Sequence, residues 1–115
     1  EIIDGSKSGN TNAKLALDIY CYRLKKYIGS YAAALGGVDA VVFTAGVGEN
    51  SPIIRELTCD GLEFMGISLD KEKNAQAIGK EMVISSNTAR VKVLAIPTNE
   101  ELVIARDTRD IIAPK

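Results

Sequence analysis

The spacing of apolar residues in the first third of the chain predicts a long amphipathic helix. Over residues 8–37, apolar side chains recur three and four positions apart, which places them on one helical face. Asn10, Thr11 or Asn12 is suited to cap its start, and the Gly36–Gly37 pair is suited to end it. We expect a core-facing helix whose apolar face consists of Leu17, Tyr20, Leu24, Ile28, Tyr31 and Leu35.

The rest of the chain alternates between short apolar runs and short helical patterns. Residues 40–43 (AVVF) are continuously apolar, which is typical of a central strand buried on both faces. Asp70 is suited to cap a later short helix, and Gly79 to close it. The order of elements indicates an α/β fold with a mixed sheet flanked by helices. Further strands are expected at 82–86 and 90–97, further helices at 51–61, 70–80 and 98–113, and a short extended segment within 63–70.

The first candidate site follows the strand at 40–43. Gly46-Val47-Gly48-Glu49-Asn50 comes next, and then Ser51 and Pro52 are suited to begin a helix. Glycines allow a ligand to approach the backbone, and a helix start at a strand's carboxyl end offers free N–H groups. The pattern is typical of a nucleotide-contacting turn. A tight turn without a ligand explains it equally well, since a third glycine and a Gly-Lys-Ser/Thr sequence are both absent.

The second candidate site follows the last expected strand. Thr98 and Glu101 have the spacing of a capping box, which gives Glu101 a structural role and leaves Glu100 without one. The Glu100 carboxylate at a strand end suits Mg²⁺, bound directly or through water. The alternative is a solvated glutamate favoured by the helix dipole. If both strands lie in one sheet, both helix starts face one cleft.

Composition excludes several function classes. The 115 residues fit one domain, and a net charge of −1 without a basic block argues against a nucleic-acid surface. No apolar stretch is long enough to cross a membrane, and the polar start gives no sign of a signal peptide. Two cysteines outside any C-x-x-C pair indicate a reducing, cytoplasmic location. The absence of histidine excludes Ser-His and Cys-His nucleophiles. Because residue 1 is Glu1, we expect a piece of a longer protein.

Four separated segments resemble the carboxyl-terminal part of the acetate kinase family, to which propionate and butyrate kinases are near relatives. They are GNTNAKLAL (9–17), FTAGVGENS (43–51), LDKEKN (69–74) and IPTNEE (96–101). The resemblance implies an incomplete ribonuclease-H-like fold of the actin/hexokinase/heat-shock ATPase superfamily. It also implies that residues 1–115 are the nucleotide-binding, carboxyl-terminal domain of a two-domain enzyme. Such enzymes convert ATP and acetate reversibly to ADP and acetyl phosphate.

The resemblance also implies roles for individual residues. Glu100 matches the glutamate implicated in Mg²⁺ binding, and Ala45 stands where many members have glycine. Family members are homodimers, for which Tyr20, Tyr27 and Tyr31 are candidate contacts. The adenosine part of ATP or ADP is expected to contact Gly46, Val47, Gly48, Glu49 and Asn50, with Ile54 lining the adenine pocket.

The family's phosphoryl-clamping segments have no counterpart in this chain. The segments that would carry the family's metal-binding asparagine and its phosphoryl-holding arginines, histidines and aspartate are missing, as is an Asp-x-Arg segment that contacts adenosine. We therefore expect no catalytic residue here and no measurable activity from the chain alone. Three alternatives stay open. The first is a non-catalytic oligomerisation module that retains the fold, and the second is a dinucleotide-binding domain with Asp70 as its ribose ligand. The third is a fragment of a propionate or butyrate kinase.

Overall fold

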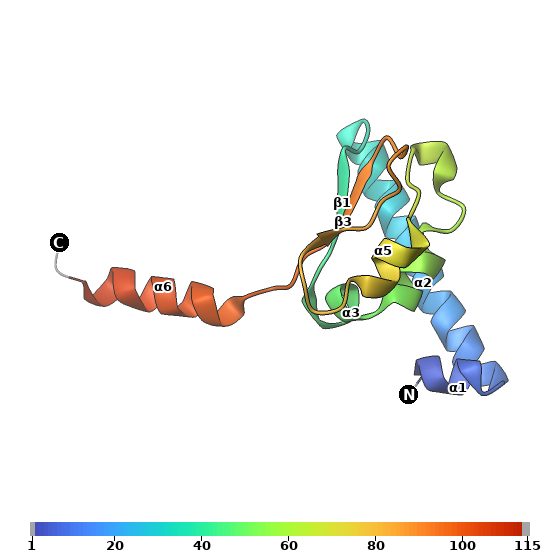
Figure 1. Ribbon diagram of the computed structural model, residues 1–115, viewed down its shortest axis with the longest axis horizontal. Helices are drawn as coiled ribbons and strands as arrows, with labels where there is room; N and C mark the ends of the chain where they lie inside the picture. Colours follow the sequence, from blue (N-terminus) through green and yellow to red (C-terminus); the bar gives the residue numbers. More distant parts are fainter. Residues whose placement is uncertain (1, 114–115) are drawn as a thin grey trace.

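The computed structural model describes residues 2–113, in which helices surround a small sheet and the last helix stands apart (Figure 1). The sheet is mixed, as predicted, because the central strand β3 pairs in parallel with β1 and antiparallel with β2. The elements are α1 (Ile2–Lys7), α2 (Thr11–Leu35), β1 (Ala40–Phe43), α3 (Ala45–Asn50), α4 (Pro52–Cys59), the 3₁₀ helix η1 (Glu63–Met65), α5 (Lys71–Gln76), β2 (Met82–Val83), β3 (Lys92–Ala95) and α6 (Glu100–Ile112).

The long helix α2 forms as its end signals predict. The side chain of Asn10 accepts a hydrogen bond from the backbone N–H of Ala13 at 3.0 Å. Gly36 ends the helix in the left-handed conformation, at φ 79°. The short helix α1 was not predicted. It lies close against α2, because a Cβ added at Gly5 would be 2.9 Å from the Cβ of Ala13.

The apolar face of α2 is covered over only part of its length, so the prediction of a fully core-facing helix is wrong. Leu17 and Cys21 are buried against α4, and Leu24 and Ile28 are half-buried. Beyond them, Tyr20, Tyr31 and Leu35 are exposed. The periodicity gave the face correctly. It could not predict how much of that face other elements would cover. The helix α4, which packs on it, is much shorter than α2.

The prediction of β1 as a central strand is also wrong. Among the described residues β1 lies at the edge of the sheet, and Val42 is 49% exposed. The central strand is β3, in which Val93 and Ala95 are fully buried. A continuous apolar run indicates contact on both faces, but it says nothing about which neighbours are present.

Two clusters of buried side chains form the core. The Cys59 thiol lies in the larger cluster, where burial raises its pKa to about 12. The larger cluster lies under the sheet and comprises Phe43, Cys59, Leu62, Ile67, Ala77, Ile84, Val91, Val93 and Ala95. The smaller cluster joins α2 to α4 and comprises Leu17, Cys21 and Ile54.

The small elements match the predictions in kind and differ in length. Asp70 caps α5 as predicted, accepting from the Lys73 N–H at 3.0 Å. The helix ends at Gln76, before Gly79, and both predicted late strands are shorter than expected. The segment at 63–70 begins as a 3₁₀ turn, and only Leu69 pairs in extended form, with Ser85.

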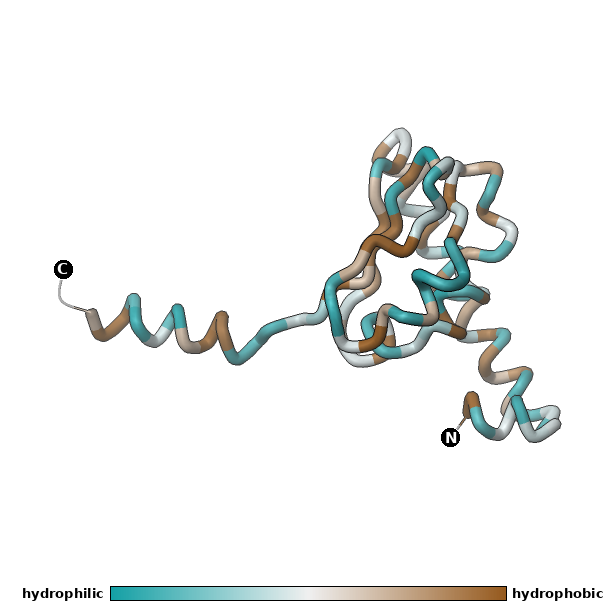
Figure 2. Tube along the Cα trace, viewed as in Figure 1, coloured by the Kyte–Doolittle hydropathy of each residue, from teal (hydrophilic) through white to brown (hydrophobic). Residues whose placement is uncertain are grey.

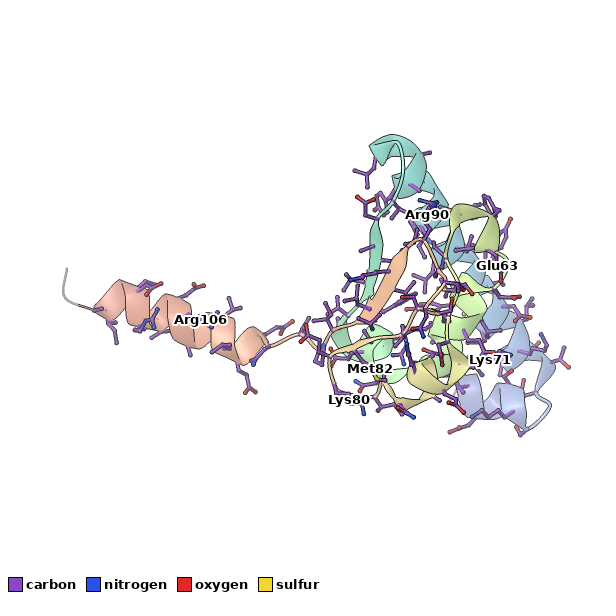
Figure 3. All side chains as sticks on the ribbon, turned by 45° about the horizontal axis from the view of Figure 1, so that its top comes forward. Glu63, Lys71, Lys80, Met82, Arg90 and Arg106 are labelled. Carbon is purple, nitrogen blue, oxygen red and sulfur yellow. The ribbon has the colours of Figure 1, made fainter. Side chains whose placement is uncertain are left out.

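The last helix, α6, is capped differently from the prediction. Asn99 accepts from the Leu102 N–H at 2.9 Å, so the proposed Thr98–Glu101 capping box is wrong. The asparagine side chain begins the helix one residue later than expected. Every residue of α6 is exposed, and apolar bands run along it in Figure 2. No other element lies beside Arg106 in Figure 3.

None of the helices within residues 2–113 has the length and apolar character needed to span a membrane.

Candidate functional site

The parallel pairing of β1 with β3 brings the two candidate loops to one edge of the sheet, as predicted. Phe43 and Ala95, the last residues of the two strands, are partners in the register. Beyond them, the Ile96 N–H donates to the Phe43 carbonyl at 2.9 Å. The Thr44 hydroxyl donates to the Ile96 carbonyl at 2.6 Å. The two segments that follow β1 and β3 therefore leave the sheet side by side.

The predicted tight turn at Gly46–Asn50 belongs to the short helix α3, which has a kink at Gly46, where the backbone angles (φ 17°, ψ −83°) are not helical. Ala45 enters it with φ 57°, a left-handed conformation that favours glycine. The Asn50 side chain closes the turn by donating to the Gly46 carbonyl at 3.0 Å. A Cβ at Gly48 would lie 3.2 Å from the Phe43 carbonyl carbon, whereas a Cβ at Gly46 would meet nothing. Gly48 thus permits close packing on β1.

A cavity of about 510 Å³ lies between α2, the end of β1 and the turn. Its walls are mostly apolar, with tyrosines on the α2 side. Ile54 contributes to it, although 93% of that side chain's surface is covered through packing on α2. The lining residues are Tyr20, Leu24, Tyr27, Ile28, Tyr31, Val41, Val42, Phe43, Thr44, Ala45, Gly46, Val47, Gly48 and Ile54.

A second, polar hollow of about 540 Å³ adjoins the first. It is lined by Ala45 and Gly46 on one side and by residues 98–101 on the other, so the two hollows share two residues. Glu100 and Glu101 both line it and both are exposed. The geometry therefore does not distinguish the two carboxylates. With the capping box absent, the choice of Glu100 depends on the resemblance alone.

Two of the predicted site residues line neither hollow. The Glu49 carboxylate accepts from the Thr98 N–H at 2.9 Å, so it joins the turn to the loop before α6. The Asn50 amide is bonded within the turn itself. The structure thus gathers Gly46, Val47, Gly48 and Ile54 around the first hollow and Glu100 around the second, while Glu49 holds the two loops together.

The sequence analysis missed Arg55, which lies behind the turn and is fully buried. Its Nη1 donates to the Gly48 carbonyl at 2.9 Å, and its Nη2 donates to the carbonyls of Asn74 and Ala77 at 2.8 and 2.7 Å. Its Nε donates to Oδ1 of Asn74 at 2.7 Å. The sequence did offer a signal for this role, because a charged residue directly follows Ile54 among the apolar positions of a short helix.

The site has one buried cation and no buried anion to pair with it. Among residues 2–113 no carboxylate lies within 4.0 Å of the Arg55 guanidinium, and burial lowers its pKa from the ordinary value. Within the same residues no group of three metal-ligating side chains occurs. A metal here would therefore depend on at most two carboxylates, those of Glu100 and Glu101, together with water and the ligand's own oxygens.

Comparison with known proteins identifies the family. Residues 1–106 match the sequence profile of the Acetokinase family. The chain belongs to the acetokinase family. It is 61% identical over 113 residues to the acetate kinase of Thermotoga petrophila, an alignment that covers 97% of this chain and 28% of the relative.

Two solved structures extend the comparison to three dimensions. The acetate kinase of Porphyromonas gingivalis is 54% identical and superposes with a TM-score of 0.89, over 97% of this chain and 28% of that one. A propionate kinase from Francisella tularensis is 34% identical with a TM-score of 0.82, over 92% and 27%. The fold is therefore that of the ribonuclease-H-like superfamily of actin, hexokinase and heat-shock ATPases. The chain spans little more than a quarter of the length of these relatives.

Proposed function

We propose that this chain is the carboxyl-terminal, nucleotide-binding domain of a phosphotransferase that converts ATP and acetate to ADP and acetyl phosphate. The observation that carries the proposal is the meeting of two hollows at Ala45 and Gly46, one apolar and one acidic. An apolar hollow suits a purine, and an acidic one suits a metal bound to phosphates. The names of the relatives supply the reaction and the carboxylate.

The adenosine half of the proposed site consists of Gly46–Asn50 and Ile54. Gly46, Val47 and Gly48 border the apolar cavity, and Ile54 closes it beside α2. A cavity of about 510 Å³ falls in the range of small-molecule sites, which also have mostly apolar walls. Glu49 and Asn50 support this half indirectly, through their bonds to Thr98 and Gly46.

The magnesium half consists of Glu100 at the start of α6. Mg²⁺ binds proteins through one or two carboxylates and completes its shell with water and substrate phosphates. Glu100, one of two exposed glutamates that line the hollow beside Gly46, fits that pattern. When bound, the ion would neutralise charge on the nucleotide phosphates. The phosphoryl-clamping residues belong to the remainder of the enzyme, so we expect this chain alone to be inactive.

A second candidate function is an oligomerisation module, favoured by the exposed tyrosines of α2. The rings of Tyr27 and Tyr31 stack with their centroids 6.3 Å apart and are 51% and 62% exposed. Tyrosine is enriched at protein interfaces. We propose that this face contributes to a homodimer of the full enzyme. Sedimentation at micromolar concentration tests the point, and a strictly monomeric chain would contradict it for this segment.

The thiols and the net charge of the chain support a proposed location and a proposed class of partner. Cys21 and Cys59 are free and buried, which fits the reducing cytoplasm. A near-neutral net charge leaves small molecules, rather than nucleic acid or membrane, as the proposed partners.

The decisive experiment is a titration of the 115-residue chain with Mg-ADP, followed by backbone amide NMR shifts. We expect saturable shifts at Gly46–Asn50, Ile54 and Glu100. A parallel titration with NAD tests the dinucleotide alternative. Absence of any shift in a folded chain would contradict a preformed half-site, and preferential binding of NAD would favour the alternative.

The metal assignment is tested in the full-length enzyme that contains this segment. Glu100→Ala should raise the Mg²⁺ concentration needed for half-maximal rate by at least about tenfold, the loss typical when a charge-assisted contact is removed. Glu101→Ala is the matched control, since it removes a carboxylate from the same hollow. Equal effects of the two substitutions would remove the assignment of Glu100.

A further inference from the structure

The Gly46–Asn50 turn has two different sides. Its front, formed by Gly46, Val47 and Gly48, borders the apolar cavity. Its back is bonded to a separate part of the chain, because Arg55 donates to the Gly48 carbonyl and the Gly79 N–H donates to the Glu49 carbonyl at 3.3 Å. The turn is thus held from the side that a ligand in the cavity would not reach.

The guanidinium of Arg55 joins three segments in one plane. Four of its five N–H donors are used, on the Gly48 carbonyl, the Asn74 carbonyl and side chain, and the Ala77 carbonyl. Asn74 is itself fixed, because its Nδ2 donates to the Pro52 carbonyl at 2.9 Å. The orientation of the fork is therefore set by the end of α5 and the start of α4, and it fixes the plane of the Gly48–Glu49 peptide.

The chemistry of this arrangement is costly for a purely structural element. A fully buried cation without a carboxylate partner loses its hydration, and only charge-assisted hydrogen bonds offset that loss. An apolar side chain would fill the same space without this penalty. What an apolar side chain cannot do is hold three carbonyl groups in fixed directions.

We infer that Arg55 is a positioning residue that, together with Asn74, holds the Gly46–Asn50 turn in its ligand-binding conformation. The expected consequence, tighter binding of a nucleoside diphosphate, rests on the proposed function. The structural content of the inference is independent of that function. Neither residue lines the cavity, so both act through Gly48 and not by touching the ligand.

The test uses two amides that report on the turn. The Ser51 N–H donates to the Val47 carbonyl at 3.0 Å, and the Gly79 N–H donates to the Glu49 carbonyl. In Arg55→Lys, which keeps the charge but not the planar fork, hydrogen exchange at both amides should accelerate at least tenfold. The amides of Ile84 and Val91, bonded elsewhere in the core, should change only with global stability. Unchanged exchange at Ser51 and Gly79 would overturn the inference.

The control is Ile84→Val, which shortens a fully buried side chain of the larger core cluster. It should accelerate exchange of the core amides without a selective effect on Ser51 and Gly79. If Arg55→Lys does not fold, Asn74→Ala decides, because it removes the acceptor of Nε and leaves the guanidinium in place. Selective acceleration at the same two amides supports the inference, and wild-type exchange there overturns it.

A Mg-ADP titration of the same variants separates this inference from the proposed function. If the wild-type chain binds, Arg55→Lys should raise the Kd at least tenfold, and Ile84→Val should leave it within twofold. An equal Kd in Arg55→Lys would overturn the inference. If the wild-type chain does not bind Mg-ADP, the proposed half-site fails, while the exchange measurements still decide the role of Arg55.

Discussion

The two halves of the candidate site are built in opposite ways. The turn at Gly46–Asn50 is held from behind by a fully buried arginine and packs closely on β1. Glu100 begins a helix in which every residue is exposed, and that helix extends away from the sheet in Figure 1. One half is fixed by contacts within this chain. The other is tied to the chain mainly through the Glu49–Thr98 hydrogen bond.

This difference indicates which half of the site the segment carries by itself. Buried hydrogen bonds and packing resist local unfolding. An exposed helix that packs on little else unfolds locally at a low cost in free energy. We therefore expect the adenosine half to be preformed, and the magnesium half to become rigid only when the remainder of the enzyme packs against it. The exposed apolar residues of α6 are consistent with a surface that packs elsewhere in a longer protein.

The largest effect should come from removing the buried charge. Arg55→Met leaves the carbonyls of Gly48, Asn74 and Ala77 without their donor, which should lower the free energy of unfolding by about 3 kcal/mol or more. Arg106→Met removes an arginine from exposed α6 and should change it by less than about 0.5 kcal/mol. Urea unfolding measures both values. Equal losses would erase the contrast between the two regions.

The next effect separates Gly48 of the turn from Gly29 of the helix α2. Gly48→Val should weaken Mg-ADP binding and also lower stability by about 1–3 kcal/mol, because its Cβ would press on the Phe43 backbone. Gly29→Ala, inside the long helix α2, adds a Cβ into open space and should not lower stability. Thermal unfolding and calorimetric titration give the two quantities. A folded Gly48→Val variant with unchanged affinity would contradict the proposed contact.

A smaller effect follows from the buried thiol of Cys59. Its pKa is raised from the ordinary 9.0 to about 12, so the neutral thiol contributes stability below pH 9 that is lost as the pH rises toward 12. By pH 10 the loss should be on the order of 1 kcal/mol. Unfolding of the wild type and Cys59→Ala at pH 7 and pH 10 isolates this part. Parallel losses in both proteins would show that the thiol does not titrate as expected.

The smallest effect should be a gain. Ala45 has φ 57°, where a Cβ is strained and glycine is not. Ala45→Gly should raise the free energy of unfolding by up to about 1 kcal/mol. Ala105→Gly, in the middle of exposed α6, is the matched control and should be neutral or destabilising. A loss of stability in Ala45→Gly would mean that the entropy of the unfolded glycine exceeds the strain.

The sequence predicted the parts of this molecule that depend on local signals. Asn10, Asp70 and Pro52 mark helix starts as expected, and the two strand ends meet at one edge. Contacts between residues far apart in the sequence could not be predicted in this way. The bond from Arg55 to Gly48 and the position of β1 at the sheet edge depend on which segments pack together, and a periodic pattern does not contain that information.

The parallel pairing of β1 with β3 also sets the order in which the site can be assembled. The bond between Thr44 and Ile96 joins residues that are 52 positions apart in the sequence. Loop closure of this length must precede the contacts that reward it, so parallel pairing is slow to form. On a ribosome, the turn and Glu100 stay apart until the last strand has left the exit tunnel. A nascent chain interrupted before β3 would therefore lack the meeting of the two loops on which the proposed nucleotide site depends.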